Sequence, residues 1–369
     1  MQVSRVKNSN IVVAVFLMFV CSFETQAQTS EAGVLFLLVP PGARHNGMGQ
    51  TGVSTANDAN AIYYNPGALG FIATQETPRD VQFMHVNWLP QFNLSDLFYD
   101  YGSIVMFLPD IGVVGYNFTY FNIGEQQRTN AAGDDLGTIH SYELSTGVTY
   151  ATKMTEDWGI GGNFKFIYSS LDNKKGTDNN TAEVQNGVGS SVAIDLGVMK
   201  KNFFVEDLTF GASLVNVGPS IAYADEDQAD PLPTNLRLGV SYPAYKSEFN
   251  NVLVAYEINR QIVRGRSTGS DPLISGNSKF FTRSAIFTTW ADNGWHRLGH
   301  NIGAEYTYSD FVAMRTGTSL DFAGKLYDLT FGVGIRYDVF KIDFAYSTGL
   351  TERFNARDGS QFYSIGVRF

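Results

Sequence analysis

The chain from residue 81 to residue 369 alternates apolar and polar residues with a period of two. This period is typical of β-strands that turn one face to an apolar environment and the other to a polar one. About fourteen such segments follow one another, without the long apolar run that a membrane-spanning helix needs. The pattern predicts an all-β fold over residues 79–369, a transmembrane antiparallel β-barrel of about 14 strands.

The last three segments, 327–337, 339–347 and 361–369, divide their residues most clearly between two faces. The face predicted to meet lipid carries large apolar side chains: Leu329, Phe331, Val333, Ile335, Phe340, Ile342, Phe344, Tyr346, Tyr363, Ile365, Val367 and Phe369. The opposite face carries small or polar residues: Thr330, Gly332, Gly334, Arg336, Lys341, Asp343, Ala345, Ser364, Gly366 and Arg368. One face suits the membrane and the other the inside of a barrel.

The same alternation places about fourteen strand cores, an even number, as single-chain bacterial barrels have. The cores are 81–88, 102–108, 112–121, 141–151, 158–169, 190–199, 208–217, 235–242, 252–259, 301–308, 311–317, 329–337, 339–347 and 362–369. Short periplasmic turns are expected at 109–111, 152–157, 309–310 and 338, and turns of intermediate length at 200–207 and 243–251. Longer loops are expected on the opposite side, at 122–140, 170–189, 218–234, 260–300 and 348–361.

The composition supports a barrel in a membrane. The chain contains 28 Phe, 19 Tyr and 37 Gly. Aromatic residues form girdles at membrane interfaces, and small residues on the inner face relieve crowding in a tilted barrel. A soluble β-sandwich or β-barrel shows the same alternation and is the alternative fold.

The first 27 residues predict a secretory signal peptide. Arg5 and Lys7 precede an apolar run at 11–20, and a polar stretch then leads to Ala27, a small residue before the expected cut. Cys21 follows the apolar run as a lipidated cysteine would, but the bulky Val20 before it disfavours that processing. Cleavage after Ala27 removes Cys21, the one cysteine. An exported chain with a net charge of −10 is a poor partner for nucleic acid and fits the bacterial outer membrane.

Residues 28–78 are rich in Gly, Asn and Pro and do not alternate as strands do. They predict turns with short helical pieces, and the segment is too small to bury a core of its own. We expect it to pack into the barrel as a hatch or plug; a disordered periplasmic tail is the alternative. The apolar groups at 36–39 and 62–64 favour packing.

Two stretches of this segment, FLLVPPGAR (36–44) and GMGQTGVSTANDANAIYYNPGAL (47–69), resemble the N-terminal signature of the PorV/PorQ family of type IX secretion proteins, which belongs to the FadL-like barrels. LTFGVGIRYDVFKIDFAY (329–346) is similar to the family's penultimate hairpin. The resemblance implies a fourteen-stranded outer-membrane barrel with an N-terminal hatch inside it. The hatch motif falls on Arg44, Met48, Gly49, Asp58, Asn65 and Pro66. Gly42 and Gly67 depart from the common patterns and leave the subfamily, PorV or PorQ, open.

Charged residues on the predicted inner face are expected to pair across the lumen, because ions in a partly dry interior need partners. They are Lys165, Asp195, Arg237, Glu257, Glu305, Arg315, Arg336, Asp343 and Arg368.

The sequence indicates no catalytic, cofactor or metal site. The acidic run at 225–230 lacks the spacing of a calcium loop. Of the five histidines only His296 and His300 are close in sequence, and no third ligand accompanies them. No GxSxG motif supports a hydrolase, although a lipid-modifying enzyme stays open as a third function.

The predicted loop at 260–300 carries more aromatic surface than a solvated loop needs, namely Phe280, Phe281, Phe287, Trp290 and Trp295. These side chains either pack over the barrel mouth or dock a partner.

The resemblance implies a nonenzymatic role in type IX secretion. Such proteins receive or shuttle cargo with a C-terminal sorting domain, pass it to a surface attachment complex, or accompany the translocon. Outer-membrane lipid is the further expected partner. The alternative is a FadL-like transporter of fatty acids or other hydrophobic compounds, which needs an apolar pocket beside the hatch and is disfavoured by a lumen crossed by ion pairs.

Overall fold

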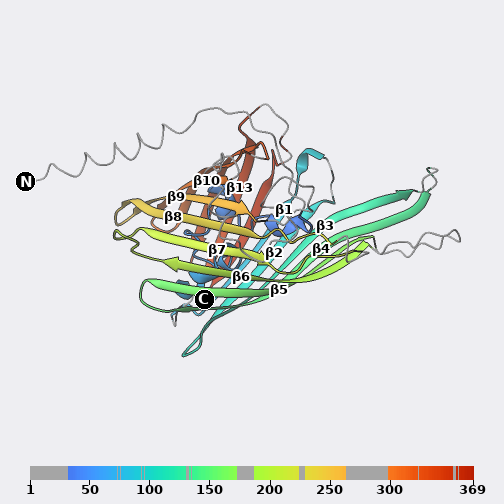
Figure 1. Ribbon diagram of the computed structural model, residues 1–369. Coiled ribbons are helices and arrows are strands. Elements are labelled where there is room, and N and C mark those ends of the chain that lie inside the picture. Colours follow the sequence, from blue (N-terminus) through green and yellow to red (C-terminus); the bar gives the residue numbers. More distant parts are fainter. Residues whose placement is uncertain are drawn as a thin grey trace, which may run out of the picture.

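Fourteen antiparallel strands of the described residues close into one barrel in a computed structural model of the chain (Figure 1). The described residues are 32–369, apart from 73, 75, 93, 95, 130–132, 134, 173–186, 224–228, 263–297, 323, 352–354 and 356. The strands are β1 (Arg79–Asn87), β2 (Phe98–Leu108), β3 (Gly112–Thr129), β4 (Asp135–Lys153), β5 (Trp158–Asp172), β6 (Gly187–Lys200), β7 (Thr209–Val217), β8 (Asn235–Lys246), β9 (Asn250–Gln261), β10 (Gly299–Tyr308), β11 (Val312–Asp321), β12 (Leu326–Tyr337), β13 (Phe340–Gly349) and β14 (Gln361–Arg368).

Each strand pairs with its neighbours in the chain, and β1 closes the barrel by pairing with β14, with Val81 opposite Val367. Closure leaves no free sheet edge in the wall, as a membrane requires. The predicted barrel and its fourteen strands are confirmed.

The two faces of the wall follow the predicted alternation. On β12, Phe331, Val333 and Ile335 are exposed, while Thr330 and Gly332 are buried. The exposed apolar residues form the lipid face, because the strand period of two sends every second side chain outward. The same division holds on β14, where Tyr363 and Ile365 are exposed and their neighbours are buried.

The connections fall into two classes. Short turns lie at 109–111, 154–157, 201–208, 247–249, 309–311 and 338–339, at the end of the barrel where β1 begins and β14 ends. Bacterial barrels have short turns on the periplasmic side, so we call this the periplasmic end. Most connections at the opposite, extracellular end are longer.

Most strand boundaries differ from the expected cores by a few residues, and two of the differences have a clear physical reason. The loop expected at 122–140 is mostly strand, because β3 and β4 continue as a two-stranded ribbon beyond their neighbours (Figure 1). Outside the membrane neither face of the ribbon needs to be apolar, so the alternation that revealed the other strands fades there. β8 also continues past Pro243, where a register shift between Pro243 and Tyr245 accommodates a residue without an N–H.

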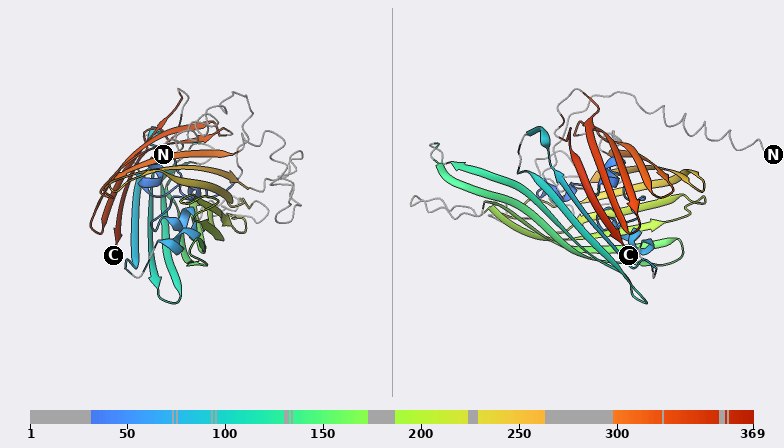
Figure 2. Two further views of the ribbon diagram at one scale, coloured as in Figure 1. Left: turned by 90° about the vertical axis from the view of Figure 1, so that its left-hand side faces the viewer. Right: turned by 180° about the vertical axis from the view of Figure 1, so that it is seen from behind.

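The N-terminal segment forms short helices in place of strands: η1 (Leu35–Leu38), α2 (Ala43–Gly47), α3 (Ala61–Tyr64) and η2 (Pro66–Phe71). One further turn of helix, η3 (Pro90–Phe92), follows β1. No helix in the described ranges is long and apolar enough to cross a membrane. We refer to residues 33–72 as the hatch; its helices, in blue, lie within the ring of strands (Figure 2).

Candidate functional site: a hatch tied to the barrel wall

Arg44 of helix α2 joins the hatch to strand β10 through a two-point contact with Glu305. The Nε donates to Oε2 at 2.9 Å and Nη2 donates to Oε1 at 2.8 Å. The remaining nitrogen, Nη1, donates to the carbonyl of Thr55 at 2.9 Å and to Oδ1 of Asn57 at 3.1 Å. Both charged side chains are buried, at 5% and 8% exposure. The planar fork of arginine thus fixes the angle as well as the distance between α2 and the wall.

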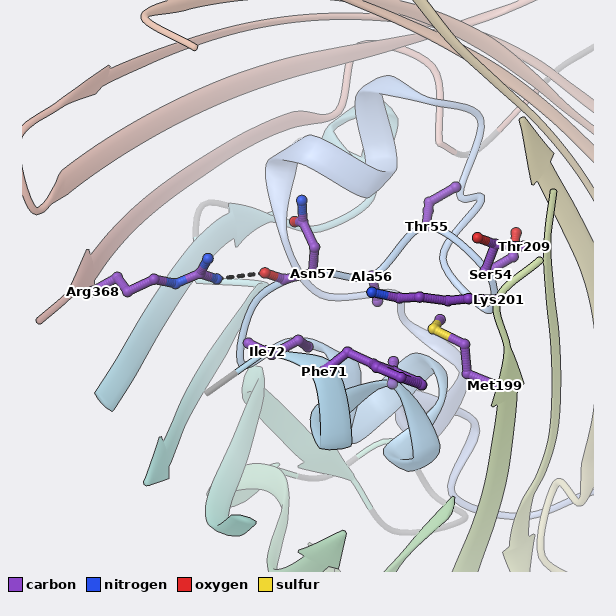
Figure 3. Close-up of a pocket in the computed structure, with 11 residues that line it drawn as sticks. Ser54, Thr55, Ala56, Asn57, Phe71, Ile72, Met199, Lys201, Thr209 and Arg368 are labelled. Carbon is purple, nitrogen blue, oxygen red and sulfur yellow. Dashed lines mark hydrogen bonds between the residues drawn. The ribbon is translucent and has the colours of Figure 1, made fainter. Parts of the chain in front are cut away.

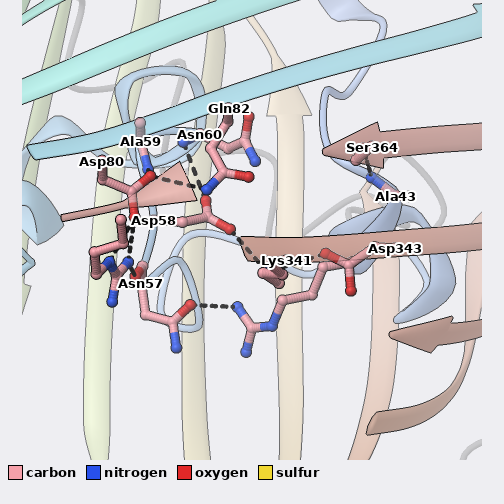
Figure 4. A network of polar contacts seen from close by, with 12 residues as sticks. Ala43, Asn57, Asp58, Ala59, Asn60, Asp80, Gln82, Lys341, Asp343 and Ser364 are labelled. Atoms are coloured by element: carbon pink, nitrogen blue, oxygen red, sulfur yellow. Dashed lines mark hydrogen bonds and ion pairs between the residues drawn. The ribbon is translucent and has the colours of Figure 1, made fainter. Parts of the chain in front are cut away.

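The contact continues as a chain of charges along the wall. Arg315 donates to Glu305 Oε2 at 2.6 Å and to Asp343 Oδ1 at 2.7 Å. Lys341 Nζ lies 3.1 Å from Asp343 Oδ2 and 3.2 Å from Asp58 Oδ2, which returns the chain to the hatch (Figure 4). Burial alone raises the pKa of Asp58, but Lys341 and the neighbouring cations outweigh it, and the pKa lies well below its usual range. Asp58 therefore carries its charge inside the barrel.

A second acidic residue, Asp80 of β1, holds the same part of the hatch. Its Oδ1 accepts from the backbone N–H of Ala59 at 2.9 Å and from Gln82 Nε2 at 2.9 Å. Its Oδ2 lies 2.6 Å from the guanidinium of Arg368, which also donates to the carbonyl of Asn57. The first and last strands thereby meet the hatch at one point.

These eight charges balance. The group contains four cations, Arg44, Arg315, Lys341 and Arg368, and four carboxylates, Asp58, Asp80, Glu305 and Asp343. A buried ion pair adds little stability over a well-packed apolar pair, but removing one member leaves an uncompensated charge at a cost of about 3–5 kcal/mol. The group therefore selects one position of the hatch.

Next to β10 in the wall, Glu257 of β9 binds the hatch backbone. Its Oε2 accepts from the N–H groups of Gly52 and Val53 at 2.8 and 2.9 Å. Arg237 of β8 lies over the ring of Tyr63, 4.5 Å from its centroid, and donates to the Tyr63 hydroxyl at 2.9 Å. The hatch is thus held by β8 and β9 as well as by β10, β13 and β1.

Strand glycines let the hatch backbone reach the wall. A Cβ on Gly317 of β11 would lie 2.3 Å from the nitrogen of Gly49, and Gly49 itself has a φ of +64° that favours glycine. Further strand glycines stand as close to hatch atoms, namely Gly159, Gly161, Gly197, Gly211, Gly239 and Gly303. These glycines belong to six strands and explain part of the high glycine content.

The Asn65–Pro66 pair anchors the last hatch helix. Asn65 Nδ2 donates to the carbonyls of Val53 and Val198 at 2.8 and 2.9 Å, and its Oδ1 accepts from Gly67 N at 3.0 Å. That last bond caps helix η2, and Pro66 occupies its first position, where its missing N–H costs nothing.

His45 is buried in the hatch without a hydrogen bond. Its ring lies 4.4 Å from that of Tyr64, and within the described residues neither ring nitrogen has a partner. Burial, together with Arg44 and Lys341 and only partly offset by Asp58, lowers the pKa of His45 to about 3. The ring is therefore neutral near pH 7.

The lumen beyond the hatch holds a further ion pair. Lys165 Nζ lies 2.9 Å from Asp195 Oδ1 and donates to Asn216 Oδ1 at 2.5 Å. Beside this pair is a cavity of about 20 Å³. That volume suits a water molecule and no organic ligand.

The structure places the sequence-predicted site residues as follows. The hatch motif lies inside the barrel, with Arg44, Met48, Asp58 and Asn65 buried. Of the charges predicted to face the lumen, seven are buried: Lys165, Asp195, Arg237, Glu257, Glu305, Arg315 and Asp343. Arg368 is partly exposed, and Arg336 is exposed, which corrects its assignment to the interior. Arg336 has the inward parity but stands at the periplasmic end of β12, where the lumen gives way to solvent.

Several predicted features lie outside the described residues: the signal peptide at 1–27, the aromatic docking loop with Phe280, Phe281, Phe287, Trp290 and Trp295, most of the acidic run, and His296. Of the two histidines that are close in sequence, His300 is described, and its Nδ1 lies 2.8 Å from the Tyr256 hydroxyl. Across the ranges that are described, no three His, Cys, Asp or Glu side chains gather as metal ligands would.

Sequence reasoning missed Asp80 and Lys341 as site residues. Each has the parity of a neighbour that faces inward, since Asp80 precedes Gln82 and Lys341 precedes Asp343 by two positions. That signal identifies the face. It does not identify the hatch atom that each residue binds, because that depends on how the hatch folds against the wall: Asp80 binds the N–H of Ala59, and Lys341 binds Asp58.

Comparisons with known proteins place this geometry in a family. The family described as "Type IX secretion system protein PorV" matches residues 22–267, a span that includes the hatch and strands β1 to β9. A search among curated proteins finds no match.

Solved structures share the fold. A deltaS2 mutant of the TodX monoaromatic hydrocarbon channel aligns with a TM-score of 0.54 at 16% identity, covering 89% of this chain and 97% of that one. A deltaS2S3 mutant of the same channel gives 0.51 at 14% identity, with 89% and 97% covered. The toluene transporter TodX of Pseudomonas putida gives 0.49 at 14% identity, with 94% and 98% covered. At these identities the first two likenesses concern the fold alone. The family match extends over two thirds of the sequence, and the chain belongs to the PorV family of type IX secretion system proteins in the outer membrane.

Proposed function

We propose that the protein works in type IX secretion by binding: it receives or shuttles cargo with a C-terminal sorting domain, or accompanies the translocon. The family match over residues 22–267 carries this proposal. The signal peptide at 1–27 would direct the chain to export, and cleavage after Ala27 would leave the hatch as the new N-terminal region.

The lumen supports a binding role over conduction. Ion pairs link hatch and wall through Arg44 and Asp58, and Asp80 of the wall accepts a hydrogen bond from the hatch backbone at Ala59. A separate pair, Lys165 and Asp195, occupies the lumen beyond. An apolar solute on this path would have to separate buried charges, which is costly in a low-dielectric interior. The surfaces at the extracellular end are then the place for a partner.

The aromatic residues of the segment 263–297 are the proposed docking group. Aromatic side chains contribute large buried areas at interfaces and are enriched among residues that dominate binding. The proposed partner is the sorting domain or a translocon subunit.

The test is recovery of partners from the native outer membrane. The tagged, detergent-solubilised protein should bring down sorting-domain cargo or translocon subunits, identified by mass spectrometry. Replacing Phe280, Phe281 and Trp290 together by Ser should abolish recovery, while the matched change of lipid-face Phe331 and Phe344 to Leu should preserve it. Intact secretion and surface attachment in a strain that lacks the gene would contradict the proposal.

A transporter of hydrophobic compounds is the second candidate, because the chain shares its fold with TodX, described as a monoaromatic hydrocarbon channel. An experiment in which the hatch is covalently tethered to the barrel wall distinguishes the two functions. A Cβ on Gly47 would lie 3.4 Å from the Cβ of Ala345 on β13, close to the spacing of about 3.8 Å found in disulfides. The pair Gly47→Cys and Ala345→Cys should therefore tether the hatch on oxidation.

The two functions differ in their response to the tether. A secretion protein that acts through its surface should work equally well oxidised and reduced. A transporter whose hatch must move should lose uptake of toluene or fatty acid when oxidised and regain it when reduced. The single variants Gly47→Cys and Ala345→Cys are the controls for the changes of side chain. The first is needed because a Cβ on Gly47 also lies 3.0 Å from the Cα of Gly332.

A further inference from the structure

A cavity of about 180 Å³ lies at the periplasmic end, between the hatch and strands β6 and β7. One water molecule needs only about 10–15 Å³ of cavity volume, so this cavity has room for a small organic group. A long acyl chain exceeds it. Figure 3 shows Lys201 reaching across the cavity above Phe71, with Arg368 on the opposite side.

Lys201 brings to this cavity a positive charge that has no ion-pair partner among the described residues. Its neighbours are paired: Lys153 Nζ, 5.8 Å from the centroid of the Phe71 ring, lies 3.0 Å from Glu156, and Lys200 Nζ, which lies over Trp158, is 3.1 Å from Asp157. In the described part of the chain no carboxylate pairs with Lys201. Burial and the charge of Lys153 lower the pKa of Lys201, and the charge of Asp157 offsets this only in part. Arg368, on the other side, is already paired with Asp80.

The position of the Lys201 ammonium is set by an aromatic ring. Its Nζ lies 4.3 Å from the centroid of the Phe71 ring, a cation–π geometry. Phe71 ends helix η2 of the hatch, so the hatch itself aims the ammonium. Beside the ring, Ile72 and Met199 line the cavity with apolar surface, and Ser54 and Thr209 add hydroxyl groups.

We propose that this cavity binds a small organic anion: a carboxylate that pairs with Lys201, next to an apolar group of about one side chain that packs on Phe71, Ile72 and Met199. Ligand sites commonly combine apolar walls with a few placed polar groups, as here. Two sources supply this chemistry, a free small carboxylic acid in the periplasm and the C-terminal residue of a polypeptide. The site is separate from the extracellular docking group proposed above and does not depend on it.

Binding is measured with the full chain in a neutral detergent, by NMR of reductively ¹³C-methylated lysines; the Lys201 resonance is the one missing in Lys201→Gln. The probes are 3-phenylpropionate for a free acid and N-acetyl-Ala-Phe for a peptide C-terminus. Saturable shifts of the Lys201 resonance, with its pKa rising toward the usual value, are the expected result. The tighter of the two probes assigns the source.

Two further probes test each half of the site. 3-Phenylpropanol lacks the carboxylate and acetate lacks the apolar group, and both should bind at least about tenfold more weakly, as the loss of one charged hydrogen bond or one apolar contact predicts.

The variants complete the test. Calorimetry measures the affinity for 3-phenylpropionate in each variant. Lys201→Gln should lower this affinity about tenfold, and Lys201→Arg should retain most of it. Lys246→Gln, an exposed lysine at the same end, is the control and should change nothing. Equal affinity in Lys201→Gln, equal binding of acetate, or the absence of saturable binding by either acid would each overturn the proposal.

Discussion

Arg44 and Glu305, 261 positions apart in the chain, form a buried two-point ion pair that joins the hatch to the barrel wall. Glu305 is shared, because Arg315 also donates to its Oε2 at 2.6 Å. The pair therefore belongs to a balanced group of charges. The two partners should respond differently to substitution.

Glu305→Met should destabilise the protein more than Arg44→Met. Without Glu305, the Arg44 guanidinium is buried and unpaired, at a cost of about 3–5 kcal/mol. Without Arg44, Glu305 still pairs with Arg315, so the loss is smaller. Urea unfolding in lipid vesicles gives the free energy of unfolding of each variant. The double variant should lose less of this free energy than the two single variants lose together. Strict additivity would show that the pair is not coupled.

His45 should make the stability depend on pH. Its pKa of about 3 in the folded protein lies below the ordinary value of 6.5, so the unfolded chain binds more protons below pH 6.5. Stability is therefore full above pH 6.5 and falls as the pH is lowered toward 3, by about 2 kcal/mol between pH 6.5 and 5.

The measurement is the unfolding free energy across this range. His45→Phe keeps an aromatic ring against Tyr64 and should remove this part of the slope. His140→Phe, at an exposed position, should leave the slope as it is. An unchanged slope in His45→Phe would assign the pH dependence to other groups.

Gly161 and Gly162 are neighbours on β5, but replacement by alanine should destabilise the protein at Gly161 and be tolerated at Gly162. A Cβ on Gly161 would lie 2.4 Å from the carbonyl oxygen of Pro66, whereas one on Gly162 would find its nearest atom at 3.4 Å, an ordinary contact. Gly161→Ala should cost about 1–3 kcal/mol and loosen the hatch, as overpacking does. Hydrogen exchange of the backbone amides at 67–72 reports the hatch directly. Similar exchange in both variants would contradict a close approach at Pro66.

Val333 and Ile111 have similar exposure, 53% and 56%, but different surroundings. Val333 lies within β12 on the lipid face, and Ile111 lies in a periplasmic turn. Val333→Lys should destabilise the barrel by about 2–4 kcal/mol and Ile111→Lys by about 0–1 kcal/mol, because the cost of a charge falls from the midplane to the interface. Unfolding from lipid vesicles measures both. Equal costs would mean that this face of β12 does not meet the hydrocarbon.

The alternation of side chains was enough to predict the barrel, its strand number and the face of nearly every charged residue. This succeeds because a period of two needs only local sequence, and a membrane imposes it on each strand separately. It failed where the membrane constraint ends: in the ribbon of β3 and β4, where polar residues on both faces hid the strands, and at Arg336, where parity points inward but the lumen has ended.

The contacts of the hatch depended on the tertiary structure. The sequence indicated that Arg44, Asp58 and Asn65 belong to one motif, and that Glu305 and Asp343 face inward. Which hatch group meets which strand follows from the register around the closed barrel and from the path of the hatch through it. The cavity beside Lys201 depends on the same arrangement, since Phe71 and Lys201 lie on different segments. Local sequence sets which face of the wall a side chain occupies; closure of the barrel around the hatch decides what it touches there.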